Sequence, residues 1–181
     1  MAARAERRRR ALSTTTITAL GIDPGLAATG FGVVGGDRQH LGVRHFECIR
    51  TDSGAPLAAR LSRIHAGAAS ALAKWRPDLV VIEKVYSLPK APGSALLLAH
   101  VRGVICLAVE QAGCPLMEIS PNEVKAALTG SGHADKEQVE QAVRRSLGLS
   151  GPVRPSHAAD ALALAVVGLR RAATGGDGRR R

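Results

Sequence analysis

The chain has 181 residues, enough for one domain with a sizeable core and too few for two domains of ordinary size. Hydrophobic residues make up 45% and charged residues 22%, a balance that is typical of globular proteins and excludes a collagen-like or wholly disordered chain. No uninterrupted apolar run approaches the ~20 residues that span a bilayer. No apolar segment follows the basic N-terminus, so we expect neither a membrane anchor nor a secretory signal.

The formal net charge of +10 is concentrated at the two ends of the chain. Residues 1–16 hold five Arg and one Glu, and residues 170–181 hold five Arg and one Asp, so each end contributes +4 and residues 17–169 only +2. We therefore expect basic disordered tails at 1–16 and 173–181. Such tails either aid solubility or contact nucleic-acid phosphates, and the sequence leaves both interpretations open.

The three cysteines, Cys48, Cys106 and Cys114, are odd in number and show no CxxC spacing. This pattern favours a reducing compartment, the cytoplasm, and indicates neither a disulfide framework nor a zinc site. Cys106 lies in an apolar stretch and is expected to be a small core residue.

The first part of the expected domain, which covers 17–172, is predicted to be three strands. A buried strand at 17–22 ends at Asp23-Pro24-Gly25, and Gly30–Val34 forms a second strand. Residues 41–50 alternate imperfectly and predict a third strand, joined to the second by a hairpin.

Helices and strands alternate in the rest of the chain. A helix follows Pro56 and stops at Pro77, with one apolar face formed by Leu57, Leu61, Ile64 and Ala68. The wholly apolar run Leu79–Ile82 predicts a central strand covered on both faces.

The segment 94–112 predicts a long helix that is apolar on more than one face, so one face should meet the sheet and another a second subunit. Pro115–Ile119 predicts the fifth strand, and Ser120 with Glu123 forms a capping box at the start of the next helix. Further helices are expected near 135–147 and 156–171. Together these elements predict an α/β fold, a mixed five-stranded sheet with helices on both faces.

Three acidic residues end or border apolar elements. Asp23 and Glu83 each terminate a buried strand, and Asp160 lies near the start of the last helix with His157 three residues earlier on the same face. Each residue alone is more often a cap or an ion-pair partner, because a buried carboxylate needs neutralisation. If the strands are adjacent, the three carboxylates and the imidazole converge, and oxygen-rich ligation suits Mg²⁺ or Mn²⁺. Two such ions can promote phosphodiester cleavage.

These motifs resemble the RuvC family of bacterial Holliday junction resolvases. The similar segments span about residues 17 to 170 and are Gly21-Ile22-Asp23-Pro24-Gly25, Thr29-Gly30-Phe31-Gly32-Val33, Val81-Ile82-Glu83 and Ala158-Ala159-Asp160-Ala161-Leu162-Ala163. The resemblance implies an RNase H-like fold, a homodimer, and metal-dependent cutting of four-way DNA junctions by paired symmetric nicks. It also implies 5′-phosphate and 3′-hydroxyl product ends and a branch-migration helicase complex, RuvA and RuvB, as partner.

The resemblance assigns Asp23, Glu83, His157 and Asp160 as the metal-binding catalytic set. The third position is often Asp in this family and His in some members, so His157 leaves the preference between Mg²⁺ and Mn²⁺ open.

The resemblance also assigns residues that bind DNA. Tyr86 stands where the family places an aromatic that stacks on an unpaired base, and Lys125 and Lys136 are expected to face the scissile phosphate. Arg102 and Lys90 are weaker candidates for the same groove, without a specific signal.

Two rival functions stay open at this point. An actin-like ATPase shares the opening strand and hairpin, although such folds need two duplicated halves and no second copy is present. A non-catalytic junction-binding protein is possible if His157 spoils the metal site, although the three retained carboxylates argue against that loss.

Overall fold

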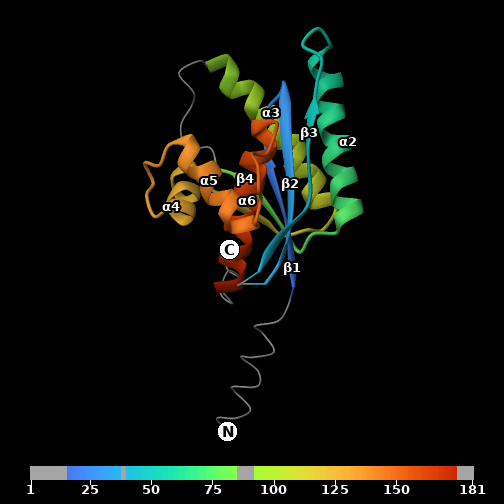
Figure 1. Cartoon of the computed structure of the whole chain (residues 1–181). Helices are drawn as coiled ribbons and strands as arrows, with labels where there is room; N and C mark the ends of the chain where they lie inside the picture. Colours follow the sequence, from blue (N-terminus) through green and yellow to red (C-terminus); the bar gives the residue numbers. More distant parts are fainter. Residues whose placement is uncertain (1–15, 38–39, 85–91, 175–181) are drawn as a thin grey trace.

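The computed structural model describes residues 16–37, 40–84 and 92–174. Tyr86, Lys90 and nearly all of both expected tails lie outside these described residues. The strands are Ile17–Asp23 (β1), Ala28–Gly36 (β2), Leu41–Arg50 (β3), Leu79–Glu83 (β4) and Leu116–Ile119 (β5). The helices are Leu57–Trp75 (α2), Pro92–Gln111 (α3), Pro121–Thr129 (α4), Lys136–Leu147 (α5) and Ser156–Thr174 (α6) (Figure 1).

The strands and helices expected from the sequence are confirmed in type and order. The helix α2 ends at Trp75, and Arg76 follows in the left-handed conformation directly before Pro77. The capping box of α4 is formed as expected, because Ser120 and Glu123 satisfy each other's backbone N–H groups. The helix α6 continues to Thr174, two residues beyond the expected domain boundary at 172.

The five strands form one mixed sheet in the order β3-β2-β1-β4-β5. The three N-terminal strands pair antiparallel as consecutive hairpins, whereas β4 pairs parallel with both β1 and β5. The β4 strand is buried because it lies between two other strands and under helices on both faces, which explains its uninterrupted apolar sequence. Since β1 and β4 are adjacent and parallel, their carboxyl ends meet at one edge of the sheet.

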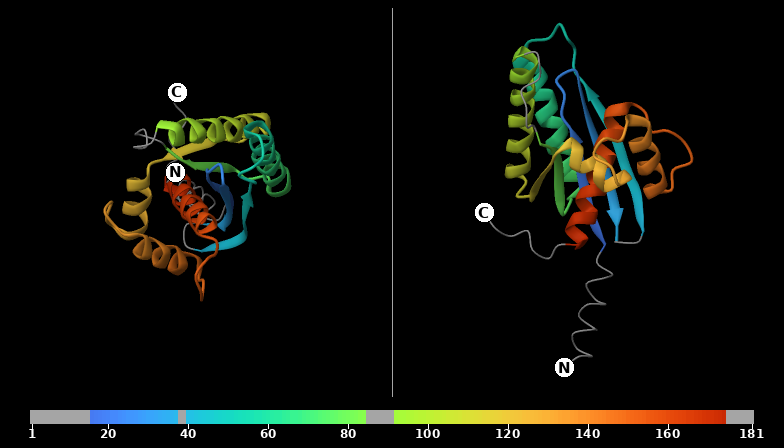
Figure 2. Two further views of the ribbon diagram at one scale, coloured as in Figure 1. Left: turned by 90° about the horizontal axis from the view of Figure 1, so that it is seen from above. Right: turned by 90° about the vertical axis from the view of Figure 1, so that its left-hand side faces the viewer.

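Helices cover both faces of this sheet and divide the core into two clusters (Figure 2). On one face, α2 and α3 pack against Val80 and Ile82 of β4. On the other, α6 with α4 and α5 packs against Leu79 and Val81. Successive side chains of β4 therefore pack alternately into the two layers of the core.

The outer side of α3 is apolar and exposed. By length and composition, Gly93–Gln111 is the one helix among the described residues that could cross a membrane, and 28% of this stretch is buried. Val101 and Ile105 meet the sheet, while Leu96 and Leu107 are 62% and 51% exposed. Cys106 is half-buried, so its expected place in the core is wrong: it lies on a helix with only one face against the sheet.

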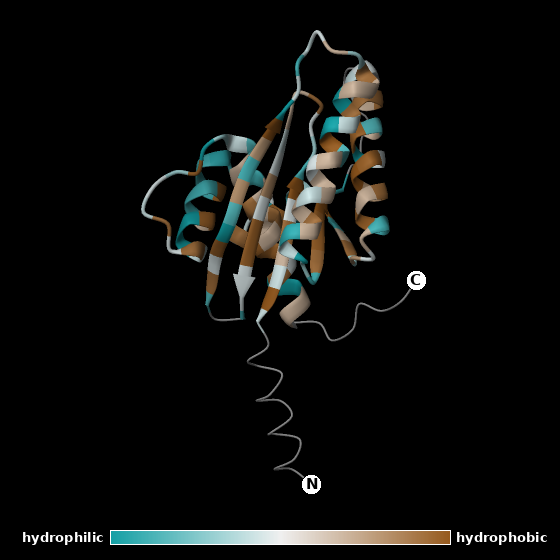
Figure 3. Cartoon of the chain, turned by 90° about the vertical axis from the view of Figure 1, so that its right-hand side faces the viewer, coloured by the Kyte–Doolittle hydropathy of each residue, from teal (hydrophilic) through white to brown (hydrophobic). Residues whose placement is uncertain are grey.

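The edge strand β3 carries hydrophobic and hydrophilic residues along its length (Figure 3).

Glycines let α6 lie directly on β1 and β2. A methyl group at Gly21, Gly30 or Gly32 would collide with the backbone of α6. At Gly30 the collision would be with the carbonyl of His157, and at Gly21 with that of Ala161. The absence of these side chains therefore brings the start of α6 close to the end of β1.

Candidate active site

The alternation of side chains along β1 and β4 aims two carboxylates at the same helix. Gly21 contacts α6, and Asp23, two residues later, projects to the same side of the sheet. Val81 packs in the α6 cluster, and Glu83 follows it by two residues. Both carboxylates therefore lie at one edge of the sheet, on the face that α6 covers.

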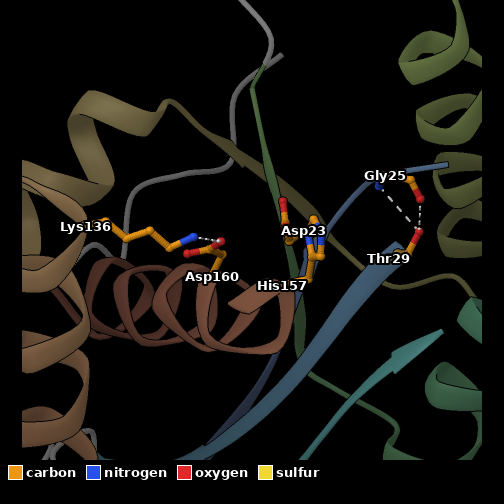
Figure 4. Close-up of polar contacts among 6 residues, drawn as sticks. All are labelled: Asp23, Gly25, Thr29, Lys136, His157 and Asp160. Carbon is orange, nitrogen blue, oxygen red and sulfur yellow. Dashed lines mark hydrogen bonds and ion pairs between the residues drawn. The ribbon is translucent and has the colours of Figure 1, made fainter. Parts of the chain in front are cut away.

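The first turns of α6 bring the remaining two residues to this edge (Figure 4). The imidazole of His157 donates from Nδ1 to Oδ2 of Asp23 over 2.6 Å. The Oδ2 atom of Asp160 lies 3.5 Å from Nζ of Lys136, which extends from the first turn of α5. The four predicted ligands thus come from β1, β4 and α6 and form one cluster with Lys136.

Burial and mutual repulsion act on the carboxylates in this cluster. Burial raises the pKa of Asp23, and the negative charge of Asp160 raises it further, against the hydrogen bond from His157. Burial also raises the pKa of Glu83, and the charges of Asp23 and Asp160 add to that rise. A nearby cation would relieve both effects because it favours the charged carboxylates.

A cavity of about 250 Å³ lies beside the cluster. Glu83 and Asp160 supply acidic groups to its wall, and Lys125 and Lys136 supply basic ones. Val124, Val139 and Leu164 contribute apolar surface. An opening with both signs of charge can hold a phosphate against bound cations, because lysines attract the phosphate and carboxylates hold metal.

The donor set suits a hard divalent cation in its chemistry, since it offers three carboxylates and one imidazole. As the side chains are placed, no three His, Cys, Asp or Glu groups within the described ranges stand close enough to enclose an ion. Instead His157 pairs with Asp23, and Lys136 pairs with Asp160. Lys136 neutralises charge on Asp160 that a metal would otherwise neutralise, and the hydrogen bond from His157 occupies an oxygen of Asp23, so ligation requires these contacts to rearrange.

The wall that carries Lys125 is fastened to α6. Glu123 accepts hydrogen bonds from the Ser120 hydroxyl at 2.6 Å and the Ser120 backbone at 2.9 Å, and it also pairs with Arg171 at 3.0 Å. The Ser120 hydrogen bonds, with that of Arg171, lower the pKa of Glu123 to about 2. This network holds the first turn of α4, and so fixes the base of the helix from which Lys125 extends.

Arg102, a weaker candidate for the groove of the lysines, binds Glu118 and the backbone of Glu83 and is not among the residues that line this cavity. The packing role of Gly30 and Gly32 was missed, although glycines at alternate positions of a buried strand signal the close approach of another backbone.

The matching family model and the curated relatives agree on one family. The family model "Crossover junction endodeoxyribonuclease RuvC" matches residues 19–168. A relative of that name from Synechococcus sp. (strain WH7803) is 40% identical over 149 residues, which are 82% of this chain and 96% of the relative. Another from Rhodococcus opacus (strain B4) is 44% identical over 148 residues, covering 81% of this chain and 78% of the relative.

Solved structures show the same likeness. RuvC of T. thermophilus, determined in complex with a Holliday junction substrate, superposes with a TM-score of 0.84 at 36% identity and covers 88% of this chain and 96% of that one. The yeast mitochondrial resolvase Ydc2 shares the fold at a TM-score of 0.59 and 14% identity, covering 92% and 86% of the two chains. The RNase H-like architecture expected from the sequence is confirmed. The chain belongs to the RuvC family of crossover junction endodeoxyribonucleases, which are metal-dependent nucleases.

Proposed function

We propose that this chain resolves four-way DNA junctions by hydrolysing one phosphodiester bond in each of two strands. The observation that carries the proposal is the convergence of Asp23, Glu83, His157 and Asp160 at one sheet edge, beside a cavity that also exposes Lys125 and Lys136. Family membership supports the same substrate, since the T. thermophilus relative was solved with a Holliday junction.

The four clustered side chains are the proposed ligands of two divalent cations, Mg²⁺ or Mn²⁺. When bound, such cations neutralise the carboxylates and supply a nucleophilic water at neutral pH. Asp23, Glu83 and Asp160 contribute oxygen donors, and His157 contributes a ring nitrogen. To hold the cations, His157 would release its hydrogen bond to Asp23, and Asp160 would release its contact with Lys136.

The lysines are proposed to hold the scissile phosphate. Lys136 is free to turn towards DNA once its contact with Asp160 is released, and Lys125 faces the same cavity from α4. Both place positive charge where negative charge develops during the displacement. Tyr86, outside the described residues, is proposed to stack on an unpaired base near the crossover. Products carry 5′-phosphate and 3′-hydroxyl ends.

Paired cuts require two active sites, and the exposed face of α3 is the proposed dimer contact. Leu96, Leu97 and Leu107 are 62%, 38% and 51% exposed on this one helix. A second copy placed over them would bury the apolar surface and relate the two sites by a two-fold axis, as the near-symmetric junction requires. The proposed setting is the cytoplasm, together with the branch-migration proteins RuvA and RuvB.

A synthetic four-way junction tests this function directly. The full chain should nick it in Mg²⁺ or Mn²⁺, and Asp23→Asn should lower the cleavage rate at least about 100-fold. Junction binding should be largely retained, because phosphate contacts elsewhere supply most of the affinity. Binding without cleavage in any divalent metal would instead support a non-catalytic junction-binding protein.

A further inference from the structure

Arg102 connects three elements beneath the active site. It lies on α3, and its side chain is 15% exposed. One guanidinium nitrogen, Nη1, donates to the main-chain carbonyl oxygen of Glu83 at the end of β4. The other, Nη2, forms an ion pair with the carboxylate of Glu118 on β5.

At the end of β4, the backbone lacks a hydrogen-bond donor on the side that faces β1. Towards β5, the ladder continues past Glu83, because the N–H of Lys84 donates to the carbonyl of Ile119 over 2.8 Å. Towards β1, the ladder ends at the pair Ile22 and Ile82, one residue before Glu83. The carbonyl of Glu83 lies beyond that last pair, and the guanidinium supplies it with a donor.

The guanidinium and the carboxylate of Glu83 belong to opposite layers. Glu83 projects its side chain to the face covered by α6, whereas α3 and Arg102 belong to the other face. Glu118 alternates with Met117 and Ile119, which pack in the α6 cluster, so it projects towards α3. Arg102 therefore holds the backbone of a proposed metal ligand from behind the sheet.

We propose that Arg102 is a positioning residue for nuclease activity: it fixes the end of β4 so that the Glu83 carboxylate is presented to the metal ions. This inference rests on the proposed function of Glu83 as a ligand. The fixed planar fork of arginine suits the role, because it reaches a carbonyl and a carboxylate at once. Groups that orient a metal ligand in this way typically contribute about 10- to 100-fold in metal affinity or activity.

The sign of the effect on metal binding separates positioning from simple electrostatics. Arg102 brings a positive charge near a site that binds cations, so charge alone predicts tighter metal binding when that charge is removed. Loss of positioning predicts weaker binding, because the carboxylate is no longer held in place. The two explanations therefore predict opposite changes for Arg102→Gln.

The experiment uses the full chain and measures Mn²⁺ binding by the paramagnetic resonance signal of free Mn²⁺, alongside junction cleavage at increasing Mn²⁺. Arg102→Gln should weaken Mn²⁺ binding about 10- to 100-fold and shift the cleavage curve to higher Mn²⁺ by a similar factor. Junction affinity without metal should not change. Arg63→Gln, an exposed arginine on the adjacent helix α2, is the matched control and should behave as wild type.

Two more variants keep the test decisive. Arg102→Lys retains the charge but not the fork, so its Mn²⁺ binding should be intermediate. Glu118→Gln leaves Arg102 on the Glu83 carbonyl and removes the charge of its other partner, so it should weaken Mn²⁺ binding less than Arg102→Gln does. If Arg102→Gln does not fold, Arg102→Lys carries the test, because charge alone predicts no change in its Mn²⁺ binding and loss of positioning predicts weaker binding. Tighter or unchanged Mn²⁺ binding in the Arg102 variants overturns the inference. A wild-type chain that cuts no junction, or a Glu83→Gln chain that cuts normally, overturns the proposed function instead.

Discussion

Glu83 illustrates the conflict between folding and function at a single residue. Its pKa is raised by burial and by the charges of Asp23 and Asp160, so the folded chain takes up a proton there more readily than the unfolded chain does. The stability associated with that proton is present at low pH and is lost as the pH rises through the raised pKa. At neutral pH without metal, the ionised carboxylate therefore disfavours the folded state.

Replacing Glu83 should consequently stabilise the metal-free protein. We expect Glu83→Gln to raise the melting temperature by a few degrees at pH 7 to 8, and we expect this gain to vanish towards pH 4, where wild-type Glu83 is protonated. Thermal melts in a chelating buffer across this range measure the effect. The exposed Glu47 on β3 supplies the control, because Glu47→Gln should show no such gain. Equal melting temperatures for Glu83→Gln and wild type at pH 8 would contradict the interpretation.

His157 is the residue expected to set the choice of metal. An imidazole suits later and softer divalent ions, whereas a carboxylate suits Mg²⁺. His157→Asp should therefore keep the enzyme active while moving the ratio of cleavage rates in Mg²⁺ and Mn²⁺ towards Mg²⁺. Side-by-side cleavage assays in the two metals check this, and an unchanged ratio would mean that His157 serves only as the hydrogen-bond partner of Asp23.

At the scale of elements, the contact between α6 and β2 depends on the missing side chain of Gly30. Gly30→Ala would place a methyl group against the backbone of His157 and force α6 away from the sheet. We expect a loss of about 1–3 kcal/mol in the free energy of unfolding, together with reduced cleavage. Denaturant unfolding measures the loss. Gly42→Ala in β3, where the added methyl group meets open space, is the matched strand control and should change stability little.

The elements themselves could be predicted because each has a strong local signal. The apolar run of β4 and the capping box at Ser120 identify their structures without knowledge of the rest of the chain. The position of Asp23 and Glu83 at strand ends likewise follows from where apolar runs stop. The partners of Arg102 could not be predicted, because its contacts join three elements that are distant in sequence. The apolar sequence around this arginine does not indicate which residues it will contact. The pairing of Lys136 with Asp160 likewise depends on how α5 is placed against α6.

At the scale of the whole molecule, the exposed leucines of α3 should control assembly. The double variant Leu96→Glu with Leu107→Glu introduces like charges that would face each other across a two-fold axis, so it should be monomeric. Light scattering coupled to gel filtration measures the mass. Junctions should then be cut once rather than in paired strands, which a supercoiled cruciform reports as nicked rather than linear product.

The matched control for this variant places the same charges elsewhere. Ala59 and Ser62 are exposed on α2, and Ala59→Glu with Ser62→Glu should leave the mass and the paired cuts unchanged. A wild-type chain that is monomeric at working concentration, or a leucine variant that remains dimeric, would show that another surface holds the two copies together.

The helix α6 starts at the active site and carries the chain away from it. Its 19 residues extend over about 28 Å, and its C-terminal end lies at the same end of the molecule as the start of β1 (Figure 1). A group attached after the end of α6 therefore starts about one helix length away from the cluster of acidic residues and His157.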